Sequence, residues 1–140
     1  MSDVVALVEG WVEAMPEGTT SERVTPSFWY VRIPGTNRSW IPIEIDVGER
    51  SVKLTSHVII EPDEAHADVY AFLLRRNHRA NGAAYSIDGK EGVLCLVTRI
   101  EHETLTDERL DEAVGTIVQE TEEVFRTILA VGFASRFKKR

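Results

Sequence analysis

The chain has 140 residues, of which 43% are apolar and 28% are charged, and its formal net charge is −7. This length fits one domain over residues 1–140, and the apolar content excludes an intrinsically disordered chain. A net negative charge repels phosphate backbones, which disfavours nucleic acid as a partner, and no stretch approaches the roughly eighteen apolar residues of a membrane span. Because the start lacks a secretory signal and Cys95 is the only cysteine, we expect a cytoplasmic protein without an internal disulfide.

The first predicted element is a helix that begins at Ser2 or Asp3. Apolar residues recur in it at helical spacing, and Pro16 and Gly18 end it. The following stretch, residues 17–26, is polar and is interpreted as a connection without regular structure.

Three strands are predicted next, over residues 28–33, 40–47 and 52–60. Apolar and polar side chains alternate strictly in the middle strand, which is the pattern of a strand with one buried face. A shift by one residue would turn every side chain over, so the alternation also predicts the register. In the register for which both hairpins agree on the face toward the core, Trp29 pairs with Ile45, Ile33 with Ile41, Ile45 with Leu54, and Val47 with Val52.

The opposite face of these strands carries aromatic and aliphatic side chains: Phe28, Tyr30, Trp40, Pro42 and Ile59. The same register places Trp40 opposite Ile59, and Pro42 opposite Arg32 and His57. If all helices pack on the first face, nothing in the chain covers this one, and contiguous exposed apolar groups mark binding surfaces. We therefore expect a partner-binding or dimer surface here, unless one helix crosses over to cover it.

The second half of the chain predicts two further helices around a hairpin. The first helix spans about residues 63–80 and ends at Asn81–Gly82, and strands 83–87 and 93–97 follow. The last helix begins after Thr106 as its N-cap and ends at Gly132, placed as a left-handed C′ glycine. The order α-β-β-β-α-β-β-α predicts an α+β fold, an antiparallel five-stranded sheet with helices packed mainly on one face.

Signatures of known catalysis are missing from the sequence. It contains no GxSxG nucleophile elbow, no GxxxxGK[ST] phosphate loop and no HExxH zinc motif. Cys95 lies mid-strand between two leucines, where a thiol is an inert apolar group. We therefore expect no enzyme, and no catalytic, cofactor-binding or metal-binding residues.

Two alternatives remain open. Asp63, His66 and Tyr70 could share one side of a helix as a metal or small-ligand site, although metal sites need three or four convergent ligands and an acidic first turn also suits the helix dipole. The basic cluster Arg75–Arg79, with the tail Lys138–Arg140, could bind nucleic acid. Cations at a helix C-terminus also have a structural explanation.

The chain resembles the YbjN family, whose fold is similar to that of type III secretion chaperones. The resemblance covers nearly the whole chain and rests on the element order, the hairpin from Asn81–Asp88 to Val93–Leu96, and the last helix closing on Gly132–Phe133. It implies a non-enzymatic homodimer that handles other proteins, with no catalytic residues to carry over. We therefore expect a protein-binding module, chaperone-like or a regulatory adaptor, that has a protein client or regulatory partner.

Overall fold

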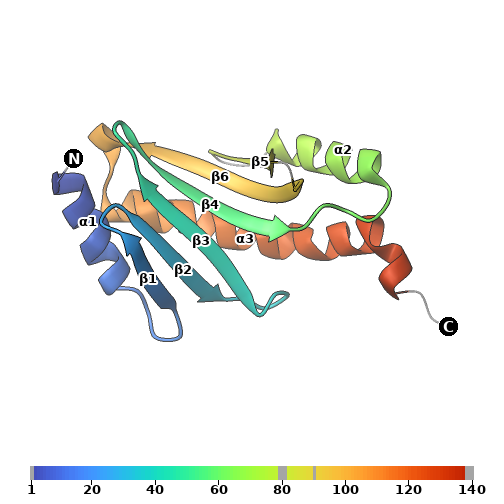
Figure 1. Ribbon diagram of the computed structural model, residues 1–140, viewed down its shortest axis with the longest axis horizontal. Helices are drawn as coiled ribbons and strands as arrows, with labels where there is room; N and C mark the ends of the chain where they lie inside the picture. Colours follow the sequence, from blue (N-terminus) through green and yellow to red (C-terminus); the bar gives the residue numbers. More distant parts are fainter. Residues whose placement is uncertain (1, 79–81, 90, 138–140) are drawn as a thin grey trace.

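The predicted α+β architecture is confirmed by a computed structural model, which describes residues 2–78, 82–89 and 91–137 (Figure 1). The elements in chain order are α1 (Ser2–Glu13), β1 (Thr20–Thr25), β2 (Phe28–Pro34), β3 (Trp40–Val47), β4 (Ser51–Ile59), α2 (His66–Asn77), β5 (Ala83–Asp88), β6 (Val93–Glu101) and α3 (Asp107–Gly132). Two short 3-10 helices, His102–Thr104 and Ala134–Phe137, flank α3. The strands form one antiparallel sheet in the order β1-β2-β3-β4-β6-β5.

The register of β2, β3 and β4 follows the apolar alternation. The four predicted pairs all form: Trp29 with Ile45, Ile33 with Ile41, Ile45 with Leu54, and Val47 with Val52. Ile41, Ile43 and Ile45 have no exposed surface. The predicted buried face is therefore the one that faces the core.

The sheet has six strands in the described part of the chain, so the prediction of five is wrong. The additional strand is β1, which lies in the stretch interpreted from its composition as a connection. All six of its residues are exposed, and it pairs with β2 at the edge of the sheet. An exposed edge strand has no buried side chains to impose an alternating pattern, so the sequence gives no sign of it.

Strands β3 and β4 separate toward the end of the sheet at which β3 begins (Figure 1). Their ladder ends at Glu44 paired with Thr55. Two predicted pairs beyond that point are absent from the ladder: Trp40 with Ile59, and Pro42 with His57. The predicted pair of Arg32 with Pro42, between β2 and β3, does form.

Arg38, in the loop between β2 and β3, lies at this opening. Its Nη2 donates a hydrogen bond of 3.1 Å to the backbone oxygen of His57, and its guanidinium lies 5.2 Å from the ring centroid of Phe125. Pro42 has no N–H to donate to a ladder. Arg38 thus donates to a backbone carbonyl of β4 that lies beyond the end of the ladder between β3 and β4.

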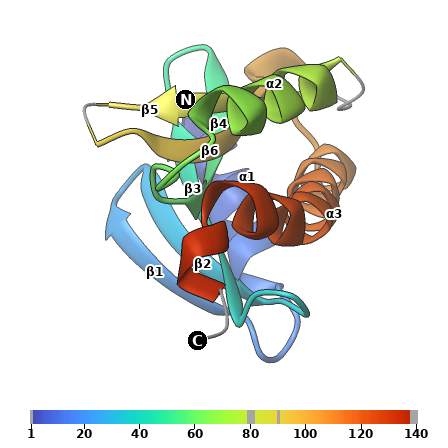
Figure 2. The same ribbon diagram turned by 90° about the vertical axis from the view of Figure 1, so that its right-hand side faces the viewer.

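The inner face of the sheet is covered by α3. Thr106 caps this helix as predicted, since its hydroxyl accepts a hydrogen bond of 3.1 Å from the Arg109 N–H. In Figure 2, seen almost along α3, the sheet curves around one side of the helix and α2 lies next to β5 and β6. Figure 1 looks onto the opposite, outer face, where no helix lies in front of the strands. Within the described residues, none of the helices has the length and hydropathy to cross a membrane.

The segment before α2 is bound to the end of α3, which delays the start of α2 to His66. The backbone N–H groups of Asp63 and Glu64 both donate to the carbonyl of Gly132, at 2.9 and 3.1 Å, and Ala65 adopts a left-handed φ of 52°. The helix ends at Asn77; the rest of its predicted end, residues 79–81, lies outside the described part of the chain.

Gly132 serves a different purpose from the predicted one. It is the last residue of α3, and its φ is not among the left-handed ones. A Cβ at this position would lie 3.0 Å from Pro62 Cβ and 3.0 Å from Val69 Cγ2. The close approach of the segment before α2, and of α2 itself, therefore explains the glycine.

Candidate protein-binding surfaces

The five residues predicted to form a binding surface lie on the outer face of the sheet. We name them the outer-face patch: Phe28, Tyr30, Trp40, Pro42 and Ile59. Trp40 is 38% exposed and the other four are half-buried. None of the described helices crosses over to cover them, and the isoleucines of β3 are buried on the other side.

The patch is divided in two by the opening between β3 and β4. Four of its members lie together on β2 and β3, whereas Ile59 belongs to β4 beyond the end of the ladder. The aromatic side chains also have charged neighbours, because Phe28 pairs with Asp46 and Tyr30 with Glu44. The Arg32 guanidinium lies 4.8 Å from the ring centroid of Trp40. The surface is thus a row of aromatic and acidic side chains with one stacked cation.

The loop between β2 and β3, which precedes Trp40, is held by Glu122 of α3. The Glu122 carboxylate accepts hydrogen bonds of 2.8 Å from the backbone N–H groups of Thr36 and Asn37, and the Asn37 side chain donates to the Glu122 carbonyl at 2.8 Å. Burial alone would raise the pKa of this carboxyl, but the backbone hydrogen bonds together hold it below its usual value. Burial lowers the pKa of Arg38 in the same loop, against the opposing charge of Glu122.

A second apolar surface lies between α2 and β5, and sequence reasoning missed it. It is a hollow of about 370 Å³ lined chiefly by Tyr70, Leu73, Leu74, Tyr85, Ile87 and Leu94. Leu74 is 68% exposed and Ile87 is 53% exposed. Leu74 follows the buried Leu73 on α2, and Ile87 lies on the same face of β5 as the buried Ala83 and Tyr85, at the end where that face becomes exposed.

The free edge of β5 beside this hollow is capped by a side chain. Asn77, at the end of α2, accepts a hydrogen bond of 2.6 Å from the Tyr85 N–H and donates one of 3.2 Å to the Tyr85 carbonyl. The backbone groups of Tyr85 are therefore not available to another strand. Asn77 thus blocks strand pairing at the middle of this edge.

A groove of about 600 Å³ separates α1 from α3 at the other end of the molecule. Its lining includes Trp11, Met15, Ile33 and Val118. The Trp11 Nε1–H donates a hydrogen bond of 2.8 Å to Asp111, which closes one wall of the groove. Asp111 of α3 thus anchors α1 at this point.

The three residues of the predicted alternative ligand site have other partners. Asp63 forms an ion pair with Arg136, whose Nη2 lies 2.9 Å from Oδ1 of the carboxylate, and hydrogen bonding to Arg136 lowers the Asp63 pKa. His66 Nε2 lies 3.4 Å from the Glu61 carboxylate and contacts Tyr70 edge to face. The Asp63 carboxylate therefore faces Arg136, and the His66 imidazole faces Glu61 and Tyr70.

The basic cluster at the end of α2 is partly neutralised. Arg76 Nε donates a hydrogen bond of 3.0 Å to Glu120, and the guanidinium also binds Glu123. The hydrogen bond with Glu120 raises the pKa of Arg76, whose side chain is 16% exposed. Arg75 is exposed, and Arg79 lies outside the described residues, as does the tail at 138–140. In the described part, the cluster therefore serves to join α2 to α3.

Cys95 lies on the outer face of β6, where it is 1% exposed. Burial, followed by the charge of Asp88, raises the pKa of its thiol to about 11, so it is not an activated nucleophile. It pairs directly with His57 of β4, and Asp88 of β5 is close to both. Sequence reasoning missed this group because it depends on which strands are neighbours.

The helix-flanked antiparallel sheet is the fold of a chain solved in the ExsC–ExsE complex. That chain matches with a TM-score of 0.57 and 18% sequence identity, over 91% of this chain and 94% of its own length, which shows a shared fold. The sequence model of the Tir chaperone protein (CesT) family matches residues 17–124. The chain therefore belongs to the Tir chaperone protein (CesT) family.

Mycobacterial proteins are also similar to this chain. An uncharacterized protein of Mycobacterium tuberculosis strain H37Rv is 33% identical over 114 residues, which is 81% of this chain and 62% of that protein. An uncharacterized protein of Mycobacterium leprae is 34% identical over 109 residues, which is 78% of this chain and 59% of that protein. The chain thus spans about three fifths of the length of these relatives. The predicted secretion-chaperone resemblance is confirmed at the level of family and fold, whereas the YbjN resemblance stays a prediction.

Proposed function

We propose that this domain is a chaperone-like module that binds an extended segment of another protein and acts as a homodimer. The observation that carries the binding function is the outer-face patch, an aromatic surface that the helices leave uncovered. Membership of the Tir chaperone protein (CesT) family supports a role in handling other proteins. The proposal assigns no catalytic residue.

The chemistry of the patch favours a client segment whose sheet-facing side chains, at every second position, are alternately apolar and basic. Successive side chains of a strand point to opposite faces, so residues on one face recur every second position. On the outer face, Phe28 and Tyr30 each lie beside an acidic residue of β3. A segment laid across these rows would place apolar groups on the aromatic rings and cations beside Asp46 and Glu44.

The second copy, in this proposal, contacts the hollow between α2 and β5. A two-fold interface uses the same surface on both subunits, so an apolar surface can be its own partner. Leu74 and Ile87 are exposed there, and Asn77 prevents pairing through the backbone of Tyr85. The contact is therefore a packing of side chains between the two copies.

Client binding is tested with labelled peptides added to the purified chain, measured by fluorescence anisotropy. We expect a peptide of repeated Leu-Ser-Lys-Ser to bind, because its Leu and Lys side chains share one face when it is extended, and peptides of repeated Leu-Ser-Glu-Ser or Ser-Ser-Lys-Ser to bind at least about tenfold more weakly. The double variant Tyr30→Ser with Trp40→Ser should lose this binding. Val24→Ser, which truncates an apolar side chain that is 54% exposed on β1, is the matched control. Equal binding of all three peptides, or unchanged binding by the double variant, contradicts the client surface.

Self-association is tested separately by light scattering of the purified chain. We expect the mass of a dimer for the unmodified chain and for Val24→Glu, and the mass of a monomer for Leu74→Glu. Both changes add a charge at an exposed position, so they differ in the surface that they alter. If the unmodified chain is a monomer, or if the Leu74→Glu variant is still a dimer, the proposed dimer interface is wrong. Neither result bears on the client surface, which the peptide experiment tests separately.

A further inference from the structure

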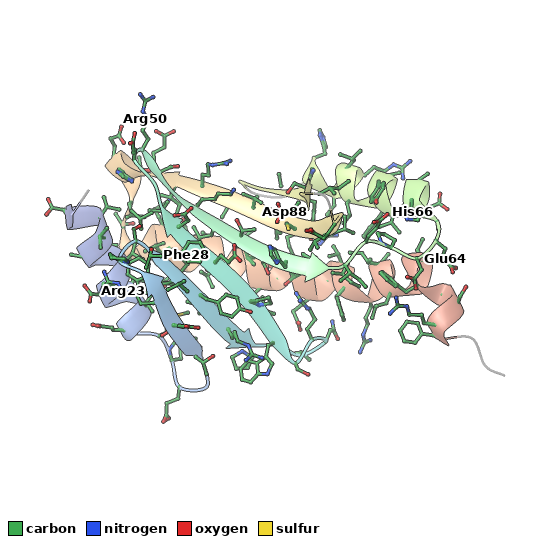
Figure 3. The ribbon with its side chains drawn as sticks, in the orientation of Figure 1. Arg23, Phe28, Arg50, Glu64, His66 and Asp88 are labelled. Carbon is green, nitrogen blue, oxygen red and sulfur yellow. The ribbon has the colours of Figure 1, made fainter. Side chains whose placement is uncertain are left out.

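Three side chains of metal-binding type meet on the outer face where β4, β6 and β5 run side by side. His57 and Cys95 form a direct cross-strand pair, and Asp88 ends the next strand. One ligand atom from each of the three lies within 4.8 Å of the others, and His57 Nε2 is 3.6 Å from Asp88 Oδ2. Figure 3 labels Asp88 near the arrowhead end of β4, well apart from His66 on α2.

The backbone holds these groups together without help from a flexible loop. Cys95 belongs to β6, which pairs with β4 on one side and with β5 on the other. Its side chain is buried, whereas the side chains of His57 and Asp88 are 43% and 62% exposed. The thiol is therefore fixed, and the imidazole and the carboxylate are free to rotate toward it.

The separations suit a tetrahedral ion. Zinc bonds of 2.0–2.3 Å place neighbouring ligand atoms roughly 3.5 Å apart. The imidazole and the carboxylate are already at that distance. The remaining separations are at most 4.8 Å, and the two exposed side chains are the ones whose rotation would shorten them.

The ligand types select the kind of ion. A thiolate, an imidazole and a carboxylate are the ligands that proteins offer to Zn²⁺, whereas Mg²⁺ and Ca²⁺ take oxygen ligands. A thiolate and a carboxylate also neutralise the charge of one divalent cation. We propose that Cys95, His57 and Asp88 bind one Zn²⁺ ion, with the fourth position open to water on the outer face. The ion joins β4, β5 and β6 through their side chains, and this inference does not depend on the proposed client or dimer.

Zinc binding by the purified full-length chain is measured by calorimetry, and cobalt is used as a spectroscopic substitute. We expect one Zn²⁺ per chain, and a near-ultraviolet thiolate-to-cobalt charge-transfer band that reports Cys95 as a ligand. Asp88→Asn should weaken Zn²⁺ binding by more than roughly tenfold, the loss that follows removal of even a supporting group. Cys95→Ser should abolish the charge-transfer band.

The matched control is His66→Gln. His66 also lies beside a carboxylate, that of Glu61, but it has no thiol near it. This variant should bind Zn²⁺ as the unmodified chain does. Because Cys95 is buried, Cys95→Ser is first checked by circular dichroism, and the exposed Asp88→Asn decides the question if the serine variant does not fold. Absence of Zn²⁺ binding, binding that Asp88→Asn leaves unchanged, or a cobalt complex without the thiolate band overturns the proposal.

Discussion

The Glu122 carboxylate accepts a hydrogen bond of 2.8 Å from the backbone N–H of Asn37, which lies 85 residues earlier in the chain. It accepts a second from Thr36, so one side chain of α3 fixes the loop between β2 and β3. This loop precedes Trp40 and carries Arg38 into the opening beside β4. A helix on the inner face thus positions an exposed aromatic residue on the outer face.

Glu122→Gln should destabilise the fold by about 1–2 kcal/mol, because a neutral amide replaces the charged carboxylate that accepts the backbone N–H groups of Thr36 and Asn37, and both hydrogen bonds become weaker. The free energy of unfolding is measured by urea denaturation at neutral pH. Glu112→Gln, on the same helix, removes an exposed carboxylate and should change it by less than about 0.5 kcal/mol. Equal stability of the two variants would show that the loop does not depend on Glu122.

The stability of the unmodified chain should also depend on pH through Glu122. The pKa of Glu122 in the folded state lies below the usual 4.5. Its contribution to the free energy of unfolding is therefore fully present above pH 4.5. This contribution is lost as the pH falls from 4.5 through the lower folded-state pKa. Urea denaturation across this range should show a shallower decline for Glu122→Gln than for the unmodified chain, and parallel curves would contradict the assignment.

Gly132→Ala should destabilise the fold by about 1–3 kcal/mol, because the new methyl group would meet Pro62 and Val69 at 3.0 Å. Neither neighbour is the end of a long flexible side chain. The matched change is Gly115→Ala on the same helix, where a Cβ meets nothing within 4 Å. That substitution should stabilise by up to about 1 kcal/mol, since alanine is the better helix former. Thermal and urea denaturation that rank the two variants in the opposite order would contradict the close packing.

The elements that the sequence predicts correctly are those with one buried face. β3 is dry on one side, so a slip of one residue would expose Ile41, Ile43 and Ile45, and the alternation determines its register. β1 carries no buried residue, and its place depends on hydrogen bonds to β2 that leave no pattern in its side chains. Where β3 and β4 have separated, Arg38 binds the backbone of β4, and no local pattern in the sequence reports this contact.

The same distinction applies to the candidate surfaces. The outer-face patch follows from alternation in strands that are consecutive in the chain, so its members could be named from the sequence. The hollow between α2 and β5 and the group of His57, Asp88 and Cys95 depend on which non-consecutive elements are neighbours. Strand order is set by packing of the whole sheet, and residue spacing alone does not report it.

Arg76→Ala should destabilise the fold by about 1.5–3 kcal/mol, because it removes charge-assisted hydrogen bonds and leaves the largely buried Glu120 carboxylate without its cation. The adjacent Arg75→Ala, at an exposed position, should change stability by less than about 0.5 kcal/mol. Urea denaturation of the two variants separates them. If both variants are equally stable, the ion pair between α2 and α3 contributes nothing measurable.

Asn77→Ala should free the edge of β5 without removing a core side chain. The Tyr85 N–H donates a hydrogen bond of 2.6 Å to the Asn77 side chain. The variant removes this acceptor and leaves the Tyr85 N–H exposed at the edge of the sheet. Hydrogen exchange of the Tyr85 amide should therefore become faster, and the variant should self-associate beyond a dimer as concentration rises, because an uncapped edge can pair with another strand. Ser86→Ala, at the exposed neighbouring position of β5, should leave both properties unchanged. Amide exchange by nuclear magnetic resonance and light scattering over a concentration series measure the two effects, and an unchanged Tyr85 exchange rate would show that Asn77 does not protect this edge.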